Sequence, residues 1–212
     1  MKEKIINGLK WFYRSYIWLG IVLLALDIIT KQIILSFKVT DGTVISDWGF
    51  VHISYILNKG AAFGMGTSNE VANRIIYLVV ATLITAGLMT FLIIKRKETK
   101  LFVRASLIMV ITGAVGNVID RLFYGPLQGA TEPFFSGRVV DWIDFWWFWP
   151  YVFNIADCCI VIAAFMLIIY VIVGEVKEAL ARRKAEVCDE KILSKSEQER
   201  LEREQKEKEE NK

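Results

Sequence analysis

The chain has 212 residues, of which 54% are hydrophobic and 13% aromatic, and its formal net charge at pH 7 is +3. A soluble domain usually carries about 45–50% apolar residues, so this excess points to membrane spans or an unusually large core. The charge is too small to indicate a nucleic-acid partner, and the single histidine, His52, argues against a histidine-based metal site or a Ser-His triad. Three cysteines without metal-ligand spacing predict no disulfide framework. Any catalysis must therefore come mainly from carboxylates.

Four stretches are long and apolar enough to cross a bilayer as helices, which takes about 20 residues. They cover residues 16–37, 75–94, 101–119 and 151–173. The first follows a basic arm, as the core of a signal peptide would, but it lacks a small-residue cleavage site and is too long. We therefore interpret it as an uncleaved span. The sequence predicts an α-helical polytopic membrane protein with a membrane domain over residues 1–176.

Three clusters of basic residues flank the four spans, and all three lie on one side if the helices alternate. The arm before the first span, the turn at residues 95–100 and the segment after residue 176 are all rich in Lys and Arg. By the positive-inside rule this side faces the cytoplasm, together with both termini. Segments 38–74 and 121–150 then face outward. Residues 177–212, rich in Glu, Lys, Arg and Gln, are predicted to form a charged cytoplasmic tail, either a solvated helix or disordered.

The two outward segments carry signals of their own. Residues 49–57 are rich in β-branched and aromatic types and predict a strand, with Asp41-Gly42 as a turn before it. Residues 142–151 hold four tryptophans and a tyrosine. Such aromatics are typical of the membrane interface, so we expect this loop in or on the outer headgroup layer.

Several ionisable residues fall inside or at the end of predicted spans, where a charge costs at least about 2.5–3.5 kcal/mol on insertion scales. Asp27 and Lys31 are four residues apart and able to pair on one helix face. Asn117 shares a face with Asp120 and Arg121 at the end of the third span. We interpret Asp27–Lys31 as an internal ion pair that neighbours a site, and Asp120–Arg121 as a scaffold pair or a helix-end anchor.

Asp157 is the carboxylate that such pairing does not explain. It has no basic residue within one helical turn, and its nearest polar neighbour in sequence is Asn154. If Asp141 meets it from the outward segment, the two carboxyls would share one proton, as in aspartic proteases. An ion or proton pathway would use the same ingredients, so the residues alone leave a protease and a transporter open. The chain shows no internal repeat of the kind that many transporters have.

Five separated blocks of the sequence resemble the lipoprotein signal peptidases, also called signal peptidase II. In chain order they are Asp27-Ile-Ile-Thr-Lys31, Asn58-Lys-Gly-Ala-Ala-Phe-Gly64, Gly113-Ala-Val-Gly-Asn-Val-Ile-Asp-Arg121, Val139-Val-Asp141 and Phe153-Asn-Ile-Ala-Asp157. One block alone would be weak, but five in the family's order are a specific signal. The resemblance covers roughly residues 16–175 and leaves the tail unexplained.

The resemblance implies four transmembrane helices with a small extracytoplasmic antiparallel β-sheet that cradles the substrate. It implies Asp141 and Asp157 as a catalytic acid/base dyad, with Asp27 and Lys31 as a structural polar pair. The substrates would be diacylglyceryl-modified prolipoproteins, cut just before the lipidated cysteine without a metal or organic cofactor. The positions expected to bind substrate or support the dyad are Asn58, Gly60, Gly113, Asn117, Asp120, Arg121, Asn154 and Ala156.

The resemblance also implies a place in the bacterial cytoplasmic membrane, with the active site toward the extracytoplasmic face. The expected partners are prolipoprotein substrates and membrane lipids, with no nucleic acid, and we expect a monomer. A non-catalytic protein that recognises lipidated partners with the same pocket is the remaining alternative. A pure binder should tolerate replacement of both aspartates by asparagine, whereas an acid/base enzyme should not.

The sequence departs from the family pattern at three places. Thr112 stands where many members have a second glycine, which should only modify close helix packing. Trp142 follows Asp141 where phenylalanine is common, which leaves Asp144 as a possible rival for the dyad. The stretch from Tyr124 to Arg138 is longer than the family's short connection, and we interpret it as either a lid or a tolerated surface insertion.

Overall fold

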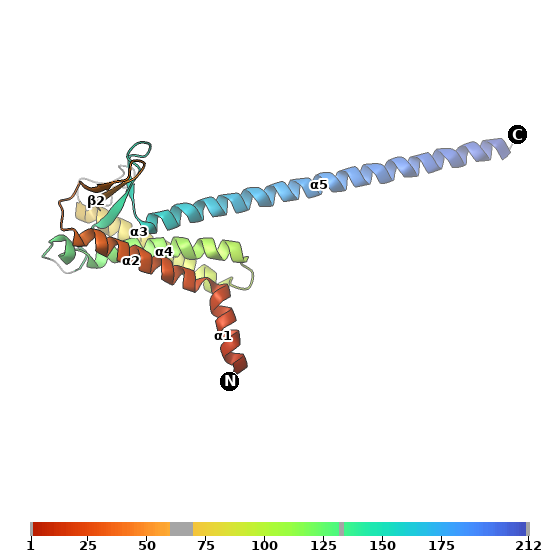
Figure 1. The fold of residues 1–212 in the computed structure, drawn as a ribbon. Coiled ribbons are helices and arrows are strands. Elements are labelled where there is room, and N and C mark those ends of the chain that lie inside the picture. The colour runs from red at the N-terminus through yellow and green to blue at the C-terminus, as the bar shows by residue number, and fades with distance from the viewer. Residues whose placement is uncertain (1, 60–69, 132–133, 211–212) are drawn as a thin grey trace. The chain divides into compact units, whose positions relative to one another are not determined.

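The computed structural model describes residues 2–59, 70–131 and 134–210 of the chain. The chain divides into two compact units, residues 1–167 and residues 168–212. The elements are shown in Figure 1. In chain order they are α1 (Lys2–Ser15), α2 (Ile17–Ser36), β1 (Thr43–Asp47), β2 (His52–Asn58), α3 (Glu70–Ile94), α4 (Leu101–Phe123), the 3₁₀ helix η2 (Pro126–Gln128), β3 (Val139–Asp144), β4 (Val152–Phe153) and α5 (Ile155–Glu210).

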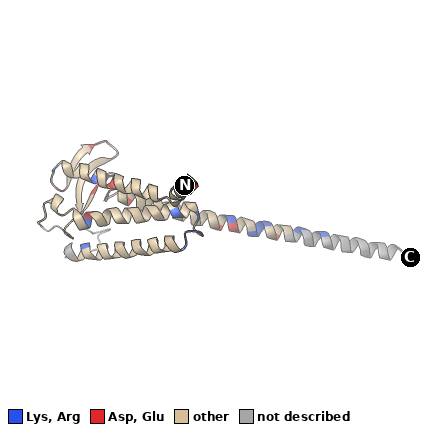
Figure 2. Ribbon diagram, turned by 90° about the horizontal axis from the view of Figure 1, so that it is seen from below, with Lys and Arg blue, Asp and Glu red and all other residues tan. Residues whose placement is uncertain are grey.

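Four helices of the described part of the chain are long and apolar enough to cross a membrane. The candidate spans are Ile17–Ser36, Ala72–Ile94, Leu101–Phe123 and Ile155–Cys188. Figure 2 shows that the first three carry few charged residues between their ends, whereas the later part of α5 carries many. Large apolar side chains such as Ile29 and Leu83 project from the helices, as contact with lipid requires. The predicted fold class, four spans with a small antiparallel sheet, is confirmed.

Three helices have bounds that differ from the hydropathy pattern, and the first of them, α3, begins at Glu70 and not at residue 75. α4 continues to Phe123, so Asp120 and Arg121 are helical residues. α5 begins only at Ile155, because residues 152–153 are taken up by pairing with β3. Hydropathy ends α4 too early because polar residues stand in its last turn, and it starts α5 too early because the apolar residues before Ile155 belong to a strand.

α1 is a separate helix that leaves the line of α2 at an angle (Figure 1). Tyr16 separates the two helices with a left-handed φ of 59°, a conformation that interrupts the regular hydrogen-bond ladder. Next to the break, the Ser15 hydroxyl donates to the Phe12 carbonyl at 2.6 Å and accepts the Ile17 amide at 3.3 Å. The basic segment before the first span is therefore helical but is not part of that span.

α4 packs against both α2 and α3, and its small residues allow close approach. A Cβ on Gly20 of α2 would lie 2.9 Å from the Thr112 hydroxyl, so Gly20 accommodates the threonine. A Cβ on Gly113 would lie only 2.3 Å from the Ala156 carbonyl oxygen. Gly113 therefore permits the first turn of α5 to rest on α4.

The sheet has the order β1-β2-β3-β4, and every neighbouring pair is antiparallel. In the β2–β3 ladder Ile56 stands opposite Asp141, with an irregularity between Ile53 and Ile56. A buried cluster of Ile34, Tyr55, Tyr124 and Val140 joins the sheet to the ends of α2 and α4. β3 is thereby held directly over one end of the helices.

Aromatic residues join the β1–β2 turn to the β3–β4 loop. The Trp146 indole donates to the Gly49 carbonyl at 3.2 Å, and the Trp147 indole donates to the Phe50 carbonyl at 2.9 Å. Trp48, Phe50 and Trp147 are nevertheless more than half exposed. Exposed indole and phenyl rings beside the ends of membrane spans are typical of an interfacial belt.

We expect Gly113→Ala to destabilise the protein by about 1–3 kcal/mol, the usual effect of forcing an extra methyl into a packed contact. The methyl would meet a backbone oxygen of α5, which cannot rotate away. The measurement is the midpoint of thermal unfolding in detergent. Gly87→Ala is the matched control, because its Cβ would meet nothing within 4 Å and alanine favours helix. Equal melting of the two variants would contradict the proposed contact.

Candidate active site

The first turn of α5 is closed by a reciprocal cap between Asn154 and Asp157. The Asn154 side-chain oxygen accepts the Asp157 amide at 2.9 Å, and the Asp157 Oδ2 accepts the Asn154 amide at 3.2 Å. This is the geometry of a capping box, which satisfies two N-terminal amides of a helix at once. The negative charge also lies at the positive end of the helix dipole. The cap fixes the direction of the Asp157 carboxylate.

Asp27 provides a second cap for α5 from a different helix. Its Oδ1 accepts the Ala156 amide at 2.9 Å, although the two residues are 129 positions apart. A Cβ on Gly116 would lie 2.5 Å from the Asp27 Oδ2, so α4 leaves room for this carboxylate. The start of α5 is therefore held by α2 and α4 together.

Lys31 is the centre of the buried polar network and is fully enclosed, with 0% of its surface exposed. Its ammonium group lies 2.8 Å from the Asp27 Oδ2, 2.9 Å from the Asp120 Oδ2 and 3.2 Å from the Asn117 Oδ1. An ammonium group has three donors, and all three are used. The ion pair expected between Asp27 and Lys31 is present.

The expected pairing of Asp120 with Arg121 is wrong. Asp120 forms its ion pair with Lys31, and its Oδ2 also accepts the Val140 amide of β3 at 3.1 Å. Arg121 instead donates to the Asn117 carbonyl at 3.0 Å and lies over the Tyr77 ring, 5.9 Å from its centroid. Consecutive helical residues do not face each other, so the two side chains diverge.

Asn154 contacts both carboxylates of the candidate dyad. Its side-chain amide donates to the Asp141 Oδ1 at 2.7 Å, while its backbone amide donates to Asp157. The same side chain also donates to the Asn117 Oδ1 at 3.1 Å, and Asn117 donates to the Asp157 Oδ1 at 2.8 Å. Two asparagines thus hold the two aspartates within one network.

Asp141 projects from β3 into this network and is only 2% exposed. Asn58 of β2 donates to its Oδ2 at 2.9 Å, so both of its oxygens accept from side-chain amides. Among the residues whose side chains the structure describes, no Lys or Arg forms an ion pair with Asp141 or Asp157. Burial, reinforced by the negative charge of Asp157, raises the pKa of Asp141 well above its usual range. The pair can therefore retain one proton to a higher pH than ordinary aspartates would.

Asp144, the possible rival, lies outside this network. Its carboxylate accepts the Ser54 hydroxyl at 3.1 Å, at the end of β3 where it pairs with β4. Because side chains alternate along a strand, residues three apart point to opposite faces. This alternation separates Asp144 from Asp141.

The remaining predicted positions have mixed outcomes. Gly113 and Ala156 form the close contact between α4 and α5, and Arg121 lies beside the network as described above. Gly60 lies outside the described residues. In the described part of the chain, no group of three or more His, Cys, Asp or Glu residues could hold a metal ion.

The connection after α4 contains contacts that the sequence did not reveal. Gln128 forms two reciprocal hydrogen bonds with the backbone of Arg138, and Arg74 of α3 donates to the Ser136 carbonyl at 2.6 Å. A Cβ on Gly137 would lie 1.9 Å from the Asp120 carbonyl oxygen, so glycine is required there. The one sequence feature that could have indicated these contacts is Arg74, a charged residue directly before an uncharged span. These contacts favour a fixed insertion over a lid.

We expect Lys31→Met to destabilise the protein by about 3–5 kcal/mol, because it leaves two buried carboxylates without their cation. The double variant Lys31→Met/Asp120→Asn should recover part of this loss, since it removes one unpaired charge. The new amide oxygen could still accept the Val140 amide. Unfolding of the three proteins in detergent measures the effect. A double variant no more stable than Lys31→Met would contradict the ion-pair account.

The fold and the buried network define a multi-pass membrane enzyme. The family model described as signal peptidase (SPase) II matches residues 19–173. A lipoprotein signal peptidase of Clostridioides difficile is 35% identical over 162 residues, covering 76% of this chain and 97% of the relative. A lipoprotein signal peptidase of Syntrophus aciditrophicus is 36% identical over 71% of this chain and 86% of the relative.

Solved structures give the same result. Two bacterial membrane enzymes determined by the in meso method, at 2.3 Å and 1.9 Å resolution, each match with a TM-score of 0.57. They are 26% and 28% identical to this chain, cover 74% of it, and are themselves covered over 87% and 92%. The chain belongs to the signal peptidase II family. It is therefore a bacterial membrane protease of the aspartic class that acts on prolipoproteins and removes their signal peptides.

Proposed function

We propose that Asp141 and Asp157 form the acid/base dyad of this peptidase. We further propose that it cuts diacylglyceryl-modified prolipoproteins just before the lipidated cysteine. The observation that supports the dyad most strongly is the double contact of Asn154, which donates to Asp141 from its side chain and to Asp157 from its backbone. Both aspartates also fall in the motifs shared with the family.

The chemistry needs one carboxylate and one carboxylic acid. The ionised carboxyl takes a proton from water as the water oxygen attacks the scissile carbonyl carbon, and the protonated carboxyl donates to the carbonyl oxygen. The carboxyl that took the water proton then gives it to the amide nitrogen as the C–N bond breaks. The other carboxyl takes back a proton from a hydroxyl of the collapsing gem-diol, which releases the new amine and the carboxylic acid and restores the dyad. Asp141 is suited to hold the shared proton because burial raises its pKa.

The supporting residues are proposed to position the dyad. Asn58, Asn117 and Asn154 supply neutral donors that orient the carboxylates without neutralising them. Lys31 and Asp120 do not contact the dyad directly. Lys31 donates to Asn117, and Asp120 accepts a backbone amide of β3. From sequence alone, Gly60 and the alanines after it are proposed to let the substrate backbone approach closely.

The basic segments support an orientation in the membrane. α1 and the turn between α3 and α4 lie at the end of the bundle away from the sheet (Figure 1). With these segments in the cytoplasm, the dyad and the sheet face the extracytoplasmic side. The signal helix of the substrate would enter sideways from the lipid, and the sheet and aromatic loop would hold the cleavage segment extended. We propose that the protein acts as a monomer with both termini in the cytoplasm.

The transporter alternative fits the distribution of polar groups poorly. The buried network lies near one end of the helices. The span from Ala72 to Ile94 contains one charged residue, Arg74, which stands at its start. A transport path would need polar groups through the full depth of the membrane. The cleavage assay below distinguishes the enzyme from a non-catalytic lipoprotein-binding protein.

Asp141→Asn and Asp157→Asn should each lower cleavage at least about a hundredfold, the usual minimum contribution of acid/base catalysis. The assay incubates purified protein in lipid with a diacylglyceryl-modified prolipoprotein and follows loss of the signal peptide by gel shift. Asp144→Asn is the matched control and should retain activity, because its partner is Ser54.

Three outcomes would change the proposal. If Asp144→Asn is inactive and Asp141→Asn is active, the mechanism survives with the wrong residue assigned. If both dyad variants still cleave, the two aspartates are not the catalytic pair. If folded wild-type protein binds the substrate without cleaving it, the result would favour a non-catalytic lipoprotein-binding protein.

The pH dependence of kcat/KM should be bell-shaped. Activity rises as the first carboxyl of the dyad ionises, and it falls as the second loses the shared proton. Because the pKa of Asp141 is raised, this loss should begin at a higher pH than for an ordinary aspartate. Asp144→Asn should leave the profile unchanged. A flat profile between about pH 4 and about pH 9 would argue against a shared proton.

A further inference from the structure

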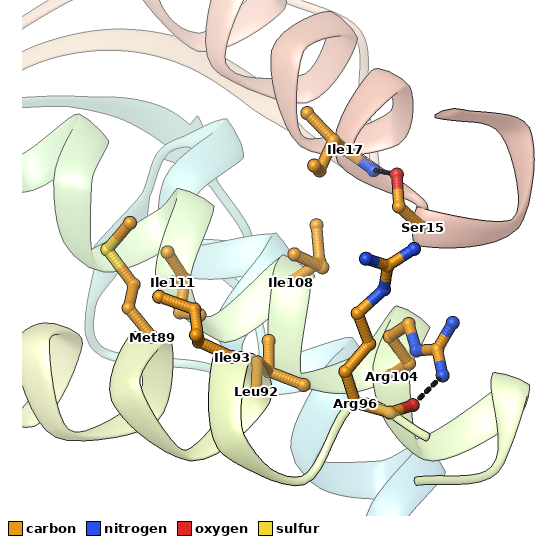
Figure 3. Close-up of a pocket in the computed structure, with 9 residues that line it drawn as sticks. All are labelled: Ser15, Ile17, Met89, Leu92, Ile93, Arg96, Arg104, Ile108 and Ile111. Carbon is orange, nitrogen blue, oxygen red and sulfur yellow. Dashed lines mark hydrogen bonds between the residues drawn. The ribbon is translucent and has the colours of Figure 1, made fainter. Parts of the chain in front are cut away.

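A cavity of about 280 Å³ lies at the end of the helical bundle away from the sheet. Figure 3 shows apolar side chains from α2, α3 and α4 along it, including Ile17, Met89 and Ile108. At one end of the same cavity the Arg96 guanidinium lies beside Ser15, and the Arg104 guanidinium lies beside the main-chain carbonyl of Arg96 (Figure 3). The cavity is therefore amphipathic, with apolar walls and a cationic opening.

A second hollow of about 870 Å³ shares Arg96 and Arg104 with the first. It is lined in addition by three more cationic side chains, Lys10, Arg14 and Lys97, and by one carboxylate, Glu98, which pairs with Lys95. These come from α1 and from the turn between α3 and α4. The break at Tyr16 turns α1 away from α2 and brings its basic residues to this rim. Five cations thus surround the mouth of the apolar cavity.

Arg104 is held in place without an anionic partner. It donates to the carbonyls of Arg14 at 3.0 Å and Thr99 at 3.1 Å, and to that of Arg96. Among the side chains described, no carboxylate forms an ion pair with it, since Glu98 is paired with Lys95 at 2.9 Å. Main-chain carbonyls orient the guanidinium but leave its positive charge in place.

We propose that this cavity binds an anionic phospholipid of the leaflet opposite the aspartate site. An acyl chain would lie against Ile17, Met89 and Ile108, and the phosphate would lie between Arg96, Arg104 and the cations of the rim. Basic pockets between membrane helices recognise anionic headgroups in this way. Guanidinium groups also match phosphate oxygens in geometry and charge.

Two features favour a lipid over a free phosphate ion. The apolar walls of the cavity would not stabilise a soluble anion. They would pack against the acyl chain of a lipid whose phosphate lies at the charged end. The cavity is also open toward the surroundings of the helices, because Met89 is 49% and Ile93 75% exposed. A neutral lipid would fill the apolar part but would bring no counterion to Arg104.

The site is independent of the chemistry proposed for the aspartates. None of its lining residues contributes to the network around Lys31, and Lys10 and Arg14 precede the region matched by the family model. Lipid binding is therefore measurable whether or not the cleavage assay succeeds.

Binding is tested on the full chain by native mass spectrometry, with phosphatidylglycerol or phosphatidylcholine added to the detergent. The variant Arg14→Gln/Lys97→Gln removes two rim charges and spares Arg104, which holds the backbone. It should weaken phosphatidylglycerol binding about tenfold or more, given the usual contribution of each cation near an anionic headgroup. Arg183→Gln/Lys184→Gln is the matched control, with equal loss of charge at residues that do not line this cavity, and should change binding less than about twofold.

Met89→Trp tests the apolar part by filling the cavity while leaving every charge in place. It should abolish the preference for phosphatidylglycerol, and soluble glycerol phosphate should not compete with the lipid. Circular dichroism confirms that each variant is folded. The proposal is overturned if phosphatidylcholine binds equally well, if the control variant loses as much affinity, or if Met89→Trp binds as the wild type does.

Discussion

The structure depends on one buried cation. Lys31 is enclosed between Asp27 and Asp120, and each of these carboxylates also accepts a backbone amide from another element. Asp27 holds Ala156 at the start of α5, and Asp120 holds Val140 in β3. A buried charge is tolerated only when it is paired and fully hydrogen-bonded, so the arrangement has little freedom to shift. One ammonium group therefore fixes α2, α4, α5 and the sheet relative to one another.

Among the described residues, neither of the two aspartates that are proposed to act forms an ion pair, although Arg121 interacts with both electrostatically. A lysine bonded directly to either carboxylate would hold that carboxylate ionised and prevent it from sharing a proton. Instead, Asn117 stands between Lys31 and Asp157, accepting from the first and donating to the second. The positive charge of Lys31 is paired with the scaffold carboxylates, and neutral side-chain amides orient the dyad. The scaffold thus permits the proton affinity that acid/base chemistry needs.

The spans, the strand around Tyr55 and the Asp27–Lys31 pair could be predicted from sequence, because each depends on local spacing or local hydropathy. The partner of Asp120 could not, because it is set by how α2 packs on α4 and not by the adjacent Arg121. The start of α5 was placed too early for a similar reason. Residues 151–153 are as apolar as a span, but β3 recruits two of them into the sheet. Long-range pairing overrides hydropathy at the ends of helices.

The two ends of the bundle handle charge in opposite ways. Near the sheet, Lys31 meets its counterions within the protein. At the other end, Arg104 meets only main-chain carbonyls, which satisfy its hydrogen bonds but carry no net charge. Bringing Lys10, Arg14 and Lys97 beside it concentrates positive charge where a bilayer supplies phosphate. The neutralising anions at that end would then come from the membrane, at the opposite end of α2 and α4 from Asp27 and Asp120.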